Sequence, residues 1–357
     1  MYKTIAAIAF TGLLYAQAPE VKTAKDVYKN IVEMKDVPAD QVGPSMQFIA
    51  ASLGVNCEFC HVQGKFEADD KGAKKTAREM IAMQNMINKN SFRGRLQVTC
   101  NTCHRGSARP VAVPNVIESD AMPTPMGGGM GAPPAGGAQQ VTADQILEKY
   151  ATALGGVDAI HKINSREMKG EITAMGTKSP IDILTKAPNM RVTISHSGNG
   201  DSYTAFDGKE GWMGNTGRPA RAMSASESAA SSIDAEFALA LRLKEMFPQL
   251  RRGRPETING VECEVLMGSA PNMPQTRFYF AKNTGLLVRQ VRLMDTPLGR
   301  NPTQIDYADY KPMSGVMMPM RWTLSRPNGR FTIQVNEVKI NADIPDAKFT
   351  KPAGEVK

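Results

Sequence analysis

The sequence lacks several features that would point to particular classes of protein. Beyond its first residues it has no run of about 20 apolar residues, so no later transmembrane helix is expected. It also has no long run of one charge, so its net charge of +8 indicates a solvated surface rather than a nucleic-acid or membrane site. Aromatic residues make up only 6%, and there are only four histidines and five cysteines. Because cysteine and histidine are scarce, their positions are informative.

The rest of the composition is typical of a soluble globular protein. Hydrophobic residues make up 41% of the chain and charged residues 22%. Methionine is abundant, at 22 residues, and supplies thioether groups for packing or for binding a soft metal. The 357 residues exceed what one compact core usually needs, so we expect two domains.

The first residues predict export. Lys3 precedes "TIAAIAFTGLLY", an apolar stretch of signal-peptide length that is too short to span a bilayer. An A-x-A pattern ends at Ala18, but Pro19 would hinder cleavage there, which favours cleavage after Ala16. We expect residues 1–18 to be a signal peptide and the mature protein to be periplasmic, without a transmembrane segment. The alternative is a buried N-terminal helix.

Residues 19–110 have a helical pattern. The stretch "GPSMQFIAASLG" has proline in its first turn and glycine at its end, as helices favour. The stretch "KKTAREMIAMQNMINKN" predicts a second, longer helix. The apolar faces are predicted to comprise Met46, Ile49, Ala50 and Leu53 in the first helix, and Met80, Met83 and Ile87 in the second. Each helix precedes, after a short connection, a segment that contains two cysteines.

The remainder divides into a linker and a β-rich domain. Residues 111–140 are rich in proline, glycine and methionine, which predicts a linker. Residues 141–357 begin with a short helix capped by Thr142, and "SIDAEFALALRLKEMF" predicts one further helix. Hairpin turns are predicted at Asp207-Gly208, Asn259-Gly260, Asn283-Thr284-Gly285 and Asn328-Gly329. The expected fold is α+β: an all-α domain, then a curved antiparallel sheet, a half-barrel, with covering helices.

Two segments share one chemical pattern, "GVNCEFCHVQG" and "VTCNTCHRGS". Their residues are Cys57, Cys60 and His61 in the first, and Cys100, Cys103 and His104 in the second. In C-x-x-C-H, cysteines at i and i+3 lie on one side of a helical turn, so both sulfurs reach one porphyrin edge. The histidine that follows then faces the iron. The sequence therefore predicts two covalently attached haem c groups, which would make the all-α part a multihaem cytochrome c domain.

Two rival interpretations are weaker. A disulfide in each segment would suit an exported protein, but it leaves the adjoining histidine without a role. A zinc site would use the same residue types, but six ligands over-fill one tetrahedral site. Two occurrences behind a signal peptide favour haem.

Each iron also needs a sixth ligand unless the site is catalytic. The remaining histidines, His161 and His196, lie in the other domain, so methionine is the natural alternative. Met46, on the inner face of the preceding helix, is the candidate for the first haem. The candidates for the second haem are Met80, Met83 and Met86. Arg105, directly after His104, is a candidate partner for a haem propionate.

A family resemblance narrows this choice. The stretch from Met46 to about Pro110 resembles the photosynthetic reaction-centre cytochrome c subunit family, through "SMQFIAASLGVNCEFCHV", "AREMIAMQNMIN" and "VTCNTCHRG". The resemblance implies that the first methionine of "MxxM", Met80, is the ligand and that Met83 packs. A full family member has four haems, whereas two motifs occur here. The stretch "KNSFRGRLQ" also lacks the histidine that ligates a distant haem in the family.

The β-rich domain shows no evident catalytic set. Cys263 lies in an alternating run and is predicted to be a buried strand residue. The stretch "YADYKPMSGVMMPMRWTLSRPNGRFTIQVNEVKIN" is similar in pattern to LolA-type lipoprotein carriers and lipoprotein-sorting proteins. That resemblance implies a half-open barrel with helices in its concave face and binding of acyl chains.

The leading hypothesis is a periplasmic, non-enzymatic electron-transfer protein with two haem c groups and His/Met ligation. Its partners would be redox proteins. The alternatives are a carrier or redox sensor that binds a lipid or quinone in the half-barrel, and a haem peroxidase with an open iron position.

Overall fold

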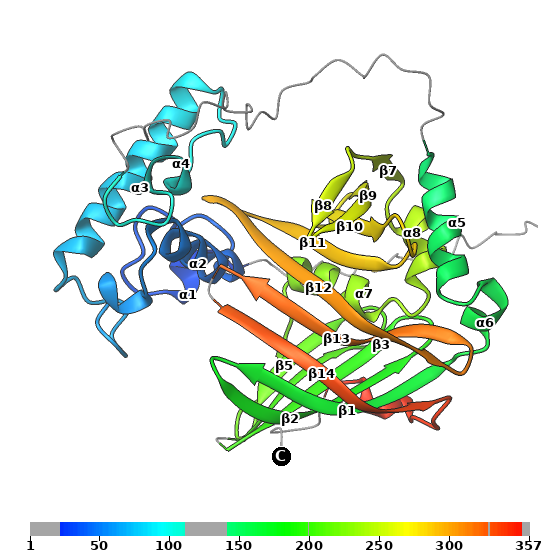
Figure 1. The fold of residues 1–357 in the computed structure, drawn as a ribbon. Coiled ribbons are helices and arrows are strands. Elements are labelled where there is room, and N and C mark those ends of the chain that lie inside the picture. The colour runs from blue at the N-terminus through cyan, green and yellow to red at the C-terminus, as the bar shows by residue number, and fades with distance from the viewer. Residues whose placement is uncertain (1–21, 111–140, 199, 328, 352–357) are drawn as a thin grey trace, which may run out of the picture.

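The structure is a computed structural model that describes residues 22–110 and 141–351, except residues 199 and 328. The predicted signal peptide (1–18) and linker (111–140) lie outside the described residues. Below, residues 22–110 are called the helical segment and residues 141–351 the sheet segment. Figure 1 shows the helical segment beside one end of the sheet.

Helices and turns make up the helical segment, apart from two isolated bridges. Its elements are α1 (Ala24–Val27), η1 (Ala39–Gln41), α2 (Val42–Leu53), η2 (Cys57–Phe59), α3 (Gly72–Ser91) and α4 (Cys100–His104). The two helices expected from the sequence, α2 and α3, are confirmed to within two residues. Helix α2 ends at Gly54, whose φ of 66° lies in the left-handed region that glycine tolerates.

The buried faces of these helices differ from the predicted ones. In α2 the buried residues are Val42, Ser45, Phe48, Ile49 and Ser52, so only Ile49 of the predicted face is fully buried. In α3 the buried residues are Lys74, Ile81, Gln84 and Asn88. Met80 and Met83, predicted to share the apolar face, are 38% and 40% exposed. The predicted face of α2 is confirmed in part, since Ile49 is buried and Met46 and Leu53 pack partly buried in the same cluster. The predicted face of α3 is wrong, because polar side chains of α3 bind backbone groups inside the segment.

The sheet segment contains, among the described residues, one antiparallel sheet of fourteen strands. The strands are β1 (Ser165–Ala174), β2 (Thr177–Lys186), β3 (Met190–Ser197), β4 (Gly200–Phe206), β5 (Gly211–Asn215), β6 (Arg221–Ala222), β7 (Gln249–Arg252), β8 (Glu256–Ile258), β9 (Val261–Ser269), β10 (Gln275–Ala281), β11 (Leu287–Thr296), β12 (Gly299–Met313), β13 (Val316–Arg326) and β14 (Gly329–Ile340). Their order is β6-β5-β4-β3-β2-β1-β14-β13-β12-β11-β10-β9-β7, with β8 paired to β9. The two ends do not pair, so the expected curved, open sheet is confirmed.

The predicted hairpins are present. Asp207-Gly208 lies between β4 and β5, and Asn259-Gly260 lies between β8 and β9. Asn283-Thr284-Gly285 lies between β10 and β11. At the fourth hairpin Gly329 pairs with Arg326, while Asn328 lies outside the described residues.

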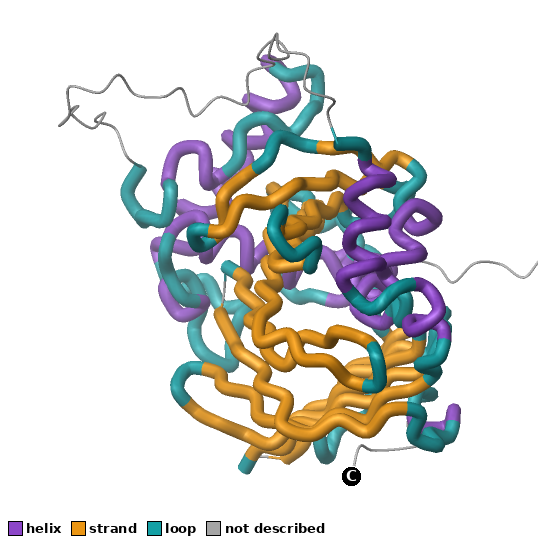
Figure 2. Tube along the Cα trace, turned by 45° about the vertical axis from the view of Figure 1, so that its right-hand side comes forward, coloured by secondary structure: helices purple, strands orange, loops and turns teal. Residues whose placement is uncertain are grey.

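Helices cover the concave side of the sheet, as Figures 1 and 2 show. They are α5 (Ala143–Ala153), α6 (Val157–His161), α7 (Ala225–Ala235) and α8 (Leu239–Met246). The short η3 (Asp346–Lys348) lies elsewhere: the residues that flank it, Ile344 and Phe349, pack in a separate cluster with Val192, Tyr203 and Trp212. Thr142 caps α5, as predicted: its hydroxyl accepts a hydrogen bond from the Gln145 N–H at 3.2 Å. The single helix predicted in "SIDAEFALALRLKEMF" is wrong, because the chain becomes extended at Glu236 and divides it into α7 and α8.

The largest core cluster joins these helices to the sheet. Tyr150 of α5 packs on Phe280 of β10, with ring centroids 5.0 Å apart, and Leu243 of α8 is fully buried. Cys263 is a fully buried residue of β9, as predicted. None of the described helices is long and apolar enough to cross a membrane.

The hairpin between β11 and β12 joins the sheet segment to the helical segment. Its tip residue, Leu298, is 1% exposed and lies in a cluster with Met34, Phe48, Ile49 and Ile81. Nearby, the Asn301 side chain donates a hydrogen bond to the Pro44 carbonyl at 2.8 Å. The two segments therefore share a small apolar core.

Glycine is required beside this tip. A Cβ at Gly299 would collide with the ring of Phe48. The close approach of α2 to the hairpin therefore depends on the missing side chain.

Candidate functional site

The first C-x-x-C-H motif lies in a tight turn directly after α2. The Asn56 side chain caps the turn by accepting a hydrogen bond from the Phe59 N–H at 3.2 Å. The His61 N–H donates to the Cys57 carbonyl at 3.0 Å, which closes one turn between these residues. Cys57 is exposed and Cys60 is half-buried, and both thiols are free. The turn therefore places cysteine and histidine together, as the spacing predicts.

The imidazole of His61 is held in one orientation by the backbone. Its Nδ1 lies 3.0 Å from the Phe66 carbonyl oxygen. Because a carbonyl oxygen only accepts, Nδ1 must carry the proton, and the lone pair is then on Nε2. Metal-bound histidines show this arrangement, in which the hydrogen bond fixes the tautomer and the ring plane.

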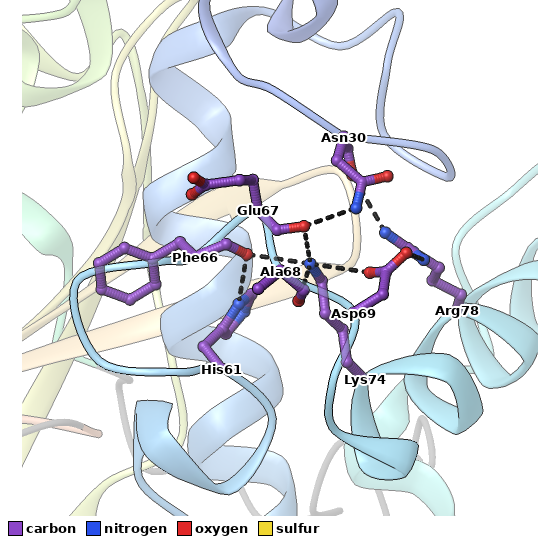
Figure 3. Close-up of polar contacts among 8 residues, drawn as sticks. All are labelled: Asn30, His61, Phe66, Glu67, Ala68, Asp69, Lys74 and Arg78. Atoms are coloured by element: carbon purple, nitrogen blue, oxygen red, sulfur yellow. Dashed lines mark hydrogen bonds and ion pairs between the residues drawn. The ribbon is translucent and has the colours of Figure 1, made fainter.

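Lys74 organises the loop that supplies this carbonyl (Figure 3). Its ammonium group, at the start of α3, donates to the carbonyl oxygens of Phe66, Glu67 and Ala68 at 2.9, 3.0 and 2.8 Å. Only 8% of this lysine is exposed. Its three donors are thus used within the loop, and the carbonyl that faces His61 is fixed by a charged group.

A second group of contacts attaches the same loop to the start of the segment. Asp69 pairs with Arg78 at 3.0 Å and with Lys74 at 3.1 Å. Hydrogen bonds from Arg78, and also from Asn30 and Lys74, hold the pKa of Asp69 well below its usual range. Arg78 also donates to the Asn30 carbonyl at 3.1 Å. Figure 3 shows these groups converging on the loop after His61.

The second motif forms helix α4 and repeats the histidine arrangement. Thr99 caps the helix, and its N–H donates to the Thr102 hydroxyl at 3.0 Å. The Nδ1 atom of His104 lies 2.9 Å from the Ser107 carbonyl oxygen, so here too the lone pair is on Nε2. Two independent turns thus present a histidine in the same tautomer.

Polar residues of α3 position the second motif. The Asn88 side chain donates to the Val98 carbonyl at 2.7 Å and accepts from the N–H groups of Gln97 and Val98, both at 2.9 Å. The Gln84 side chain accepts from the Cys100 thiol at 3.3 Å. It also donates to the Leu298 carbonyl at 3.4 Å. Cys100 is thereby connected to the β11–β12 hairpin through one side chain.

Burial affects one thiol of each motif. It raises the pKa of Cys60 and that of Cys100, while Cys57 and Cys103 are exposed. A thiol with a raised pKa is mostly protonated near neutral pH, and the thiolate is the form that attacks to make a disulfide. All four thiols of the two motifs are free in the structure.

A glycine contact holds the two motifs side by side. The Gly106 N–H, just after the second motif, donates to the Ser52 carbonyl at 2.8 Å. Gly54, just before the first motif, lies so close that a Cβ there would collide with the Gly106 carbonyl oxygen. The two attachment segments are therefore neighbours in space.

We expect Gly54→Ala to disrupt this contact. Gly54 and Gly64 both have positive φ, of 66° and 74°, so alanine at either costs about 1–2 kcal/mol of backbone strain. Around Gly64 nothing lies within 4 Å of an added Cβ, whereas at Gly54 the backbone of Gly106 must move. Chemical unfolding should show a larger loss for Gly54→Ala. Equal losses for the two variants would mean that the contact does not matter.

The candidate sixth ligands differ in burial. Met46 of α2 is partly buried against the cluster around Phe48 and Ile49. The candidates of α3, Met80, Met83 and Met86, are all exposed. The structure therefore does not show the packing role expected for Met83. Arg105 ends α4 in the left-handed region, with φ of 49°, and is exposed.

The remaining histidines are not close to these motifs in the chain. Both ring nitrogens of His196 face carboxylates, Asp182 at 3.1 Å and Asp201 at 3.0 Å. Its hydrogen bond to Asp182, followed by that to Asp201, raises the pKa of His196. His161 is exposed at the end of α6.

The residues present fit a c-type haem. Each motif offers two free thiols and an oriented imidazole Nε2. The helical segment also has many exposed apolar side chains: Val27, Tyr28, Val32, Phe59, Phe66, Met80, Met83, Met86 and Leu96. Such side chains suit contact with a large apolar macrocycle. In the described part of the chain no three His, Cys, Asp or Glu side chains gather as a site for a bare metal ion, so the zinc alternative has no geometric support.

Several of these groups were not predicted from the sequence. The carbonyls of Phe66 and Ser107 carry no sequence signal, since every residue has one. Asn88 and Gln84 lie on a helix face that the apolar spacing did not mark. Lys74 resembles any solvated lysine until its loop is folded over it.

Solved structures similar to the chain include a DUF1329 family protein from Desulfovibrio piger and a LolA superfamily protein from Nitrosomonas europaea. The first is 12% identical, with a TM-score of 0.43, covering 58% of this chain and 96% of that one. The second is 16% identical, with a TM-score of 0.43, covering 59% and 98%.

Curated relatives match the part of the chain that carries the motifs. The photosynthetic reaction center cytochrome c subunit of Roseobacter denitrificans is 34% identical over 113 residues, covering 27% of this chain and 30% of the relative. The same subunit of Thermochromatium tepidum is 31% identical over 91 residues, covering 24% and 22%. The chain thus spans less than a third of the length of these relatives. Residues 7–173, which contain both C-x-x-C-H motifs, match the family described as photosynthetic reaction centre cytochrome C subunit, and the resemblance predicted from the motifs is confirmed.

Proposed function

We propose that the protein is a periplasmic carrier of single electrons with two covalently attached haem c groups. The observation that carries this proposal is the repeated histidine geometry. In both motifs Nδ1 donates to a backbone carbonyl, so that Nε2 is available to bind iron. The family resemblance supports haem c and electron transfer, and favours a carrier over an enzyme.

The chain's own residues would hold each haem by two thioethers and two axial ligands. Cys57 and Cys60 would form thioethers at the first haem, and His61 would ligate its iron, with Met46 as the sixth ligand. Haem iron, when bound, alternates between the ferrous and ferric states and so accepts or gives one electron. The Phe66 carbonyl, which accepts a hydrogen bond from Nδ1, would hold the His61 ring in one orientation in both oxidation states.

The second haem would be held in the same way. Its thioethers would come from Cys100 and Cys103 and its axial ligands from His104 and Met80. Arg105 is proposed to pair with a propionate, because guanidinium matches carboxylate geometry. The contact between Gly54 and Gly106 brings the two motifs close together, so the two haems would be neighbours, which would suit transfer from one to the other.

The partners of this relay would be redox proteins. With a net charge of +8, the chain is suited to a partner with an acidic docking face. Association would then slow as salt is added, because exposed charges are screened.

The proposal is tested by counting haems. We expect protein matured with the cytochrome c assembly machinery to carry two haems per chain in a pyridine haemochrome assay. Cys60→Ser should reduce the count to one, because the first site loses a thioether and its stable attachment. The control is Cys263→Ser, in the sheet segment, which should retain both haems. Matured protein that is colourless, or a Cys60→Ser variant that retains both haems, would contradict the proposal.

A second function is favoured by a cavity in the sheet segment. The cavity has a volume of about 1000 Å³ and largely apolar walls, which suits a lipid or quinone. The protein would then carry or sense such a ligand.

A further inference from the structure

The cavity lies between the concave face of the sheet and α7, and reaches α2. Apolar side chains from several strands line it, among them Met168, Phe206, Met318, Trp322 and Phe331. Gly43, Pro44 and Gln47 of α2 also line it, so the helical segment forms part of the wall. The cavity is at the large end of the range for small-molecule sites, about 300–1000 Å³.

Three arginines from separate strands line the same space. They are Arg166 of β1, Arg191 of β3 and Arg292 of β11. These strands face the same cavity across the curved sheet, although β3 and β11 are far apart in its order. A guanidinium in an apolar cavity is costly unless an anion accompanies it.

Protein groups satisfy these guanidiniums only in part. Arg292 pairs with the Asp234 carboxylate at 3.0 Å and donates to the Ala230 carbonyl at 2.6 Å. Arg191 donates to the Asp234 carbonyl at a long 3.4 Å. Arg166 lies over the ring of Phe237, 4.1 Å from its centre. Among the described ion pairs, none includes Arg166 or Arg191.

Unpaired polar atoms concentrate around this cavity. Six buried side-chain atoms of the described residues have no hydrogen-bond partner, and four of them belong to residues that line it. The four are Nε of Arg166, Nε of Arg292, Oγ1 of Thr185 and Oδ1 of Asn301. An unsatisfied buried polar group costs about 1–3 kcal/mol. A ligand with its own polar atoms would remove part of that cost.

The other charged residues of the lining do not neutralise the positive charge of these three arginines. Arg221 forms a paired contact with Glu227, both oxygens at 2.7 Å. Glu236 faces Arg242, at 3.8 Å. Asp40 and Arg326 complete the charged lining. Asp234 is therefore the one carboxylate in this described lining that pairs with any of the three arginines.

Burial acts on the same arginines. It lowers the pKa of Arg166 to about 10, and it also lowers the pKa of Arg191, where Asp234 acts in the opposite direction. An anion placed between them would favour the charged forms. This supports an anionic partner but is secondary to the geometry.

We propose that the cavity binds an amphiphile with a long apolar chain and an anionic head, a carboxylate or a phosphate, held by Arg166, Arg191 and Arg292. The inference rests on the second function above, the carrier, and specifies its ligand. The apolar chain lies along the methionine and aromatic walls, and the head lies at the arginines. Guanidinium binds carboxylate and phosphate with the same forked geometry, so both heads are included.

The test is equilibrium dialysis of the haem-loaded full chain with three sixteen-carbon probes below their micellar concentrations. Palmitate carries a carboxylate, hexadecyl phosphate a phosphate, and hexadecanol no charge. We expect at least one anionic probe to bind about tenfold or more tightly than hexadecanol. Arg166→Met should remove about tenfold of that affinity, since it deletes the charge and retains an apolar stem.

The matched control is Arg321→Gln. Arg321 is exposed and, next to Trp322 on β13, points to the opposite face of the strand. The substitution Arg321→Gln removes one positive charge from the protein without altering the cavity, so the affinity for the anionic probes should not change. Arg191→Met serves as the second cavity variant, and thermal unfolding of each variant checks folding.

The outcomes are separable. Binding by only one anionic probe supports the proposal and identifies the head. Equal binding of all three probes, or equal weakening by Arg166→Met and Arg321→Gln, overturns the anionic head but leaves a hydrophobic carrier. If no probe binds, the carrier function falls as well. Haem content is measured separately, so none of these results bears on electron transfer.

Discussion

Met80→Ala is expected to leave the second haem iron without a thioether ligand. A ferric haem with histidine alone, or with water in the sixth position, becomes largely high-spin, whereas His/Met ligation keeps it low-spin. Roughly half of the weak ferric thioether-to-iron band should disappear, because one of the two proposed haems is affected. Electron paramagnetic resonance of the oxidised protein should show a new high-spin signal. Reductive titration should show a lower potential for one haem, since thioether ligation raises it.

Met83→Ala is the matched control for this experiment. Met83 lies one turn along α3 and is as exposed as Met80, at 40% against 38%. Its loss should leave both haems low-spin. Met46→Ala should also remove about half of the thioether-to-iron band, but through the first haem. The variant that combines Met46→Ala and Met80→Ala should therefore lose the band completely. If Met83→Ala removes half of the thioether-to-iron band and Met80→Ala does not, the assignment of Met80 as the ligand is wrong.

Leu298→Ala is expected to destabilise the helical segment although it lies in the sheet segment. Leu298 is 1% exposed and packs between α2 and α3. Removing a buried leucine side chain costs about 2–5 kcal/mol, because apolar burial is lost and a cavity remains. The same change should loosen the Gln84 side chain, which binds the Leu298 carbonyl and the Cys100 thiol. The measurement is denaturant unfolding: haem absorbance reports on the helical segment, and far-ultraviolet circular dichroism reports on the secondary structure of the whole chain.

Leu96→Ala provides the comparison. Leu96 belongs to the helical segment but is 40% exposed, so its loss should cost much less. If Leu298→Ala changes the haem-detected midpoint no more than Leu96→Ala does, the two segments do not share a core in solution.

The sequence predicted elements better than it predicted contacts. Helix α2 and the four hairpin turns have local signals: Pro44 and Gly54 at the ends of the helix, and Asp-Gly, Asn-Gly or Asn-Thr-Gly at the turns. Helix α3 was predicted from its spacing of apolar residues. The division of α7 from α8 at Glu236 carries no such signal, because alanine before it and alanine and leucine after it favour a helix. The insertion of Leu298 between helices was also not predictable, since the contact joins residues some 250 positions apart and depends on tertiary packing.

The site was predictable where its chemistry depends on spacing. Cys57, Cys60 and His61 stand close in the chain, so their meeting follows from one turn. The support for that turn comes from backbone carbonyls and from Lys74, whose position depends on how the loop folds over α3. The buried arginines of the cavity were missed for a related reason. Arg166 and Arg292 look like ordinary strand residues until the sheet curves and brings β1 and β11 together.

Helix α2 has one consequence that follows from its position. It carries Met46, and its residues Pro44 and Gln47 form part of the cavity wall. A ligand bound in the cavity that changes the reduction potential of the first haem must therefore bind the ferrous and the ferric protein with different affinities. The two changes correspond to the same free energy, because thermodynamic coupling is reciprocal. With such coupling, each change in the oxidation state of the first haem would strengthen or weaken ligand binding. The protein would then bind or release its ligand as it exchanges electrons with its redox partners.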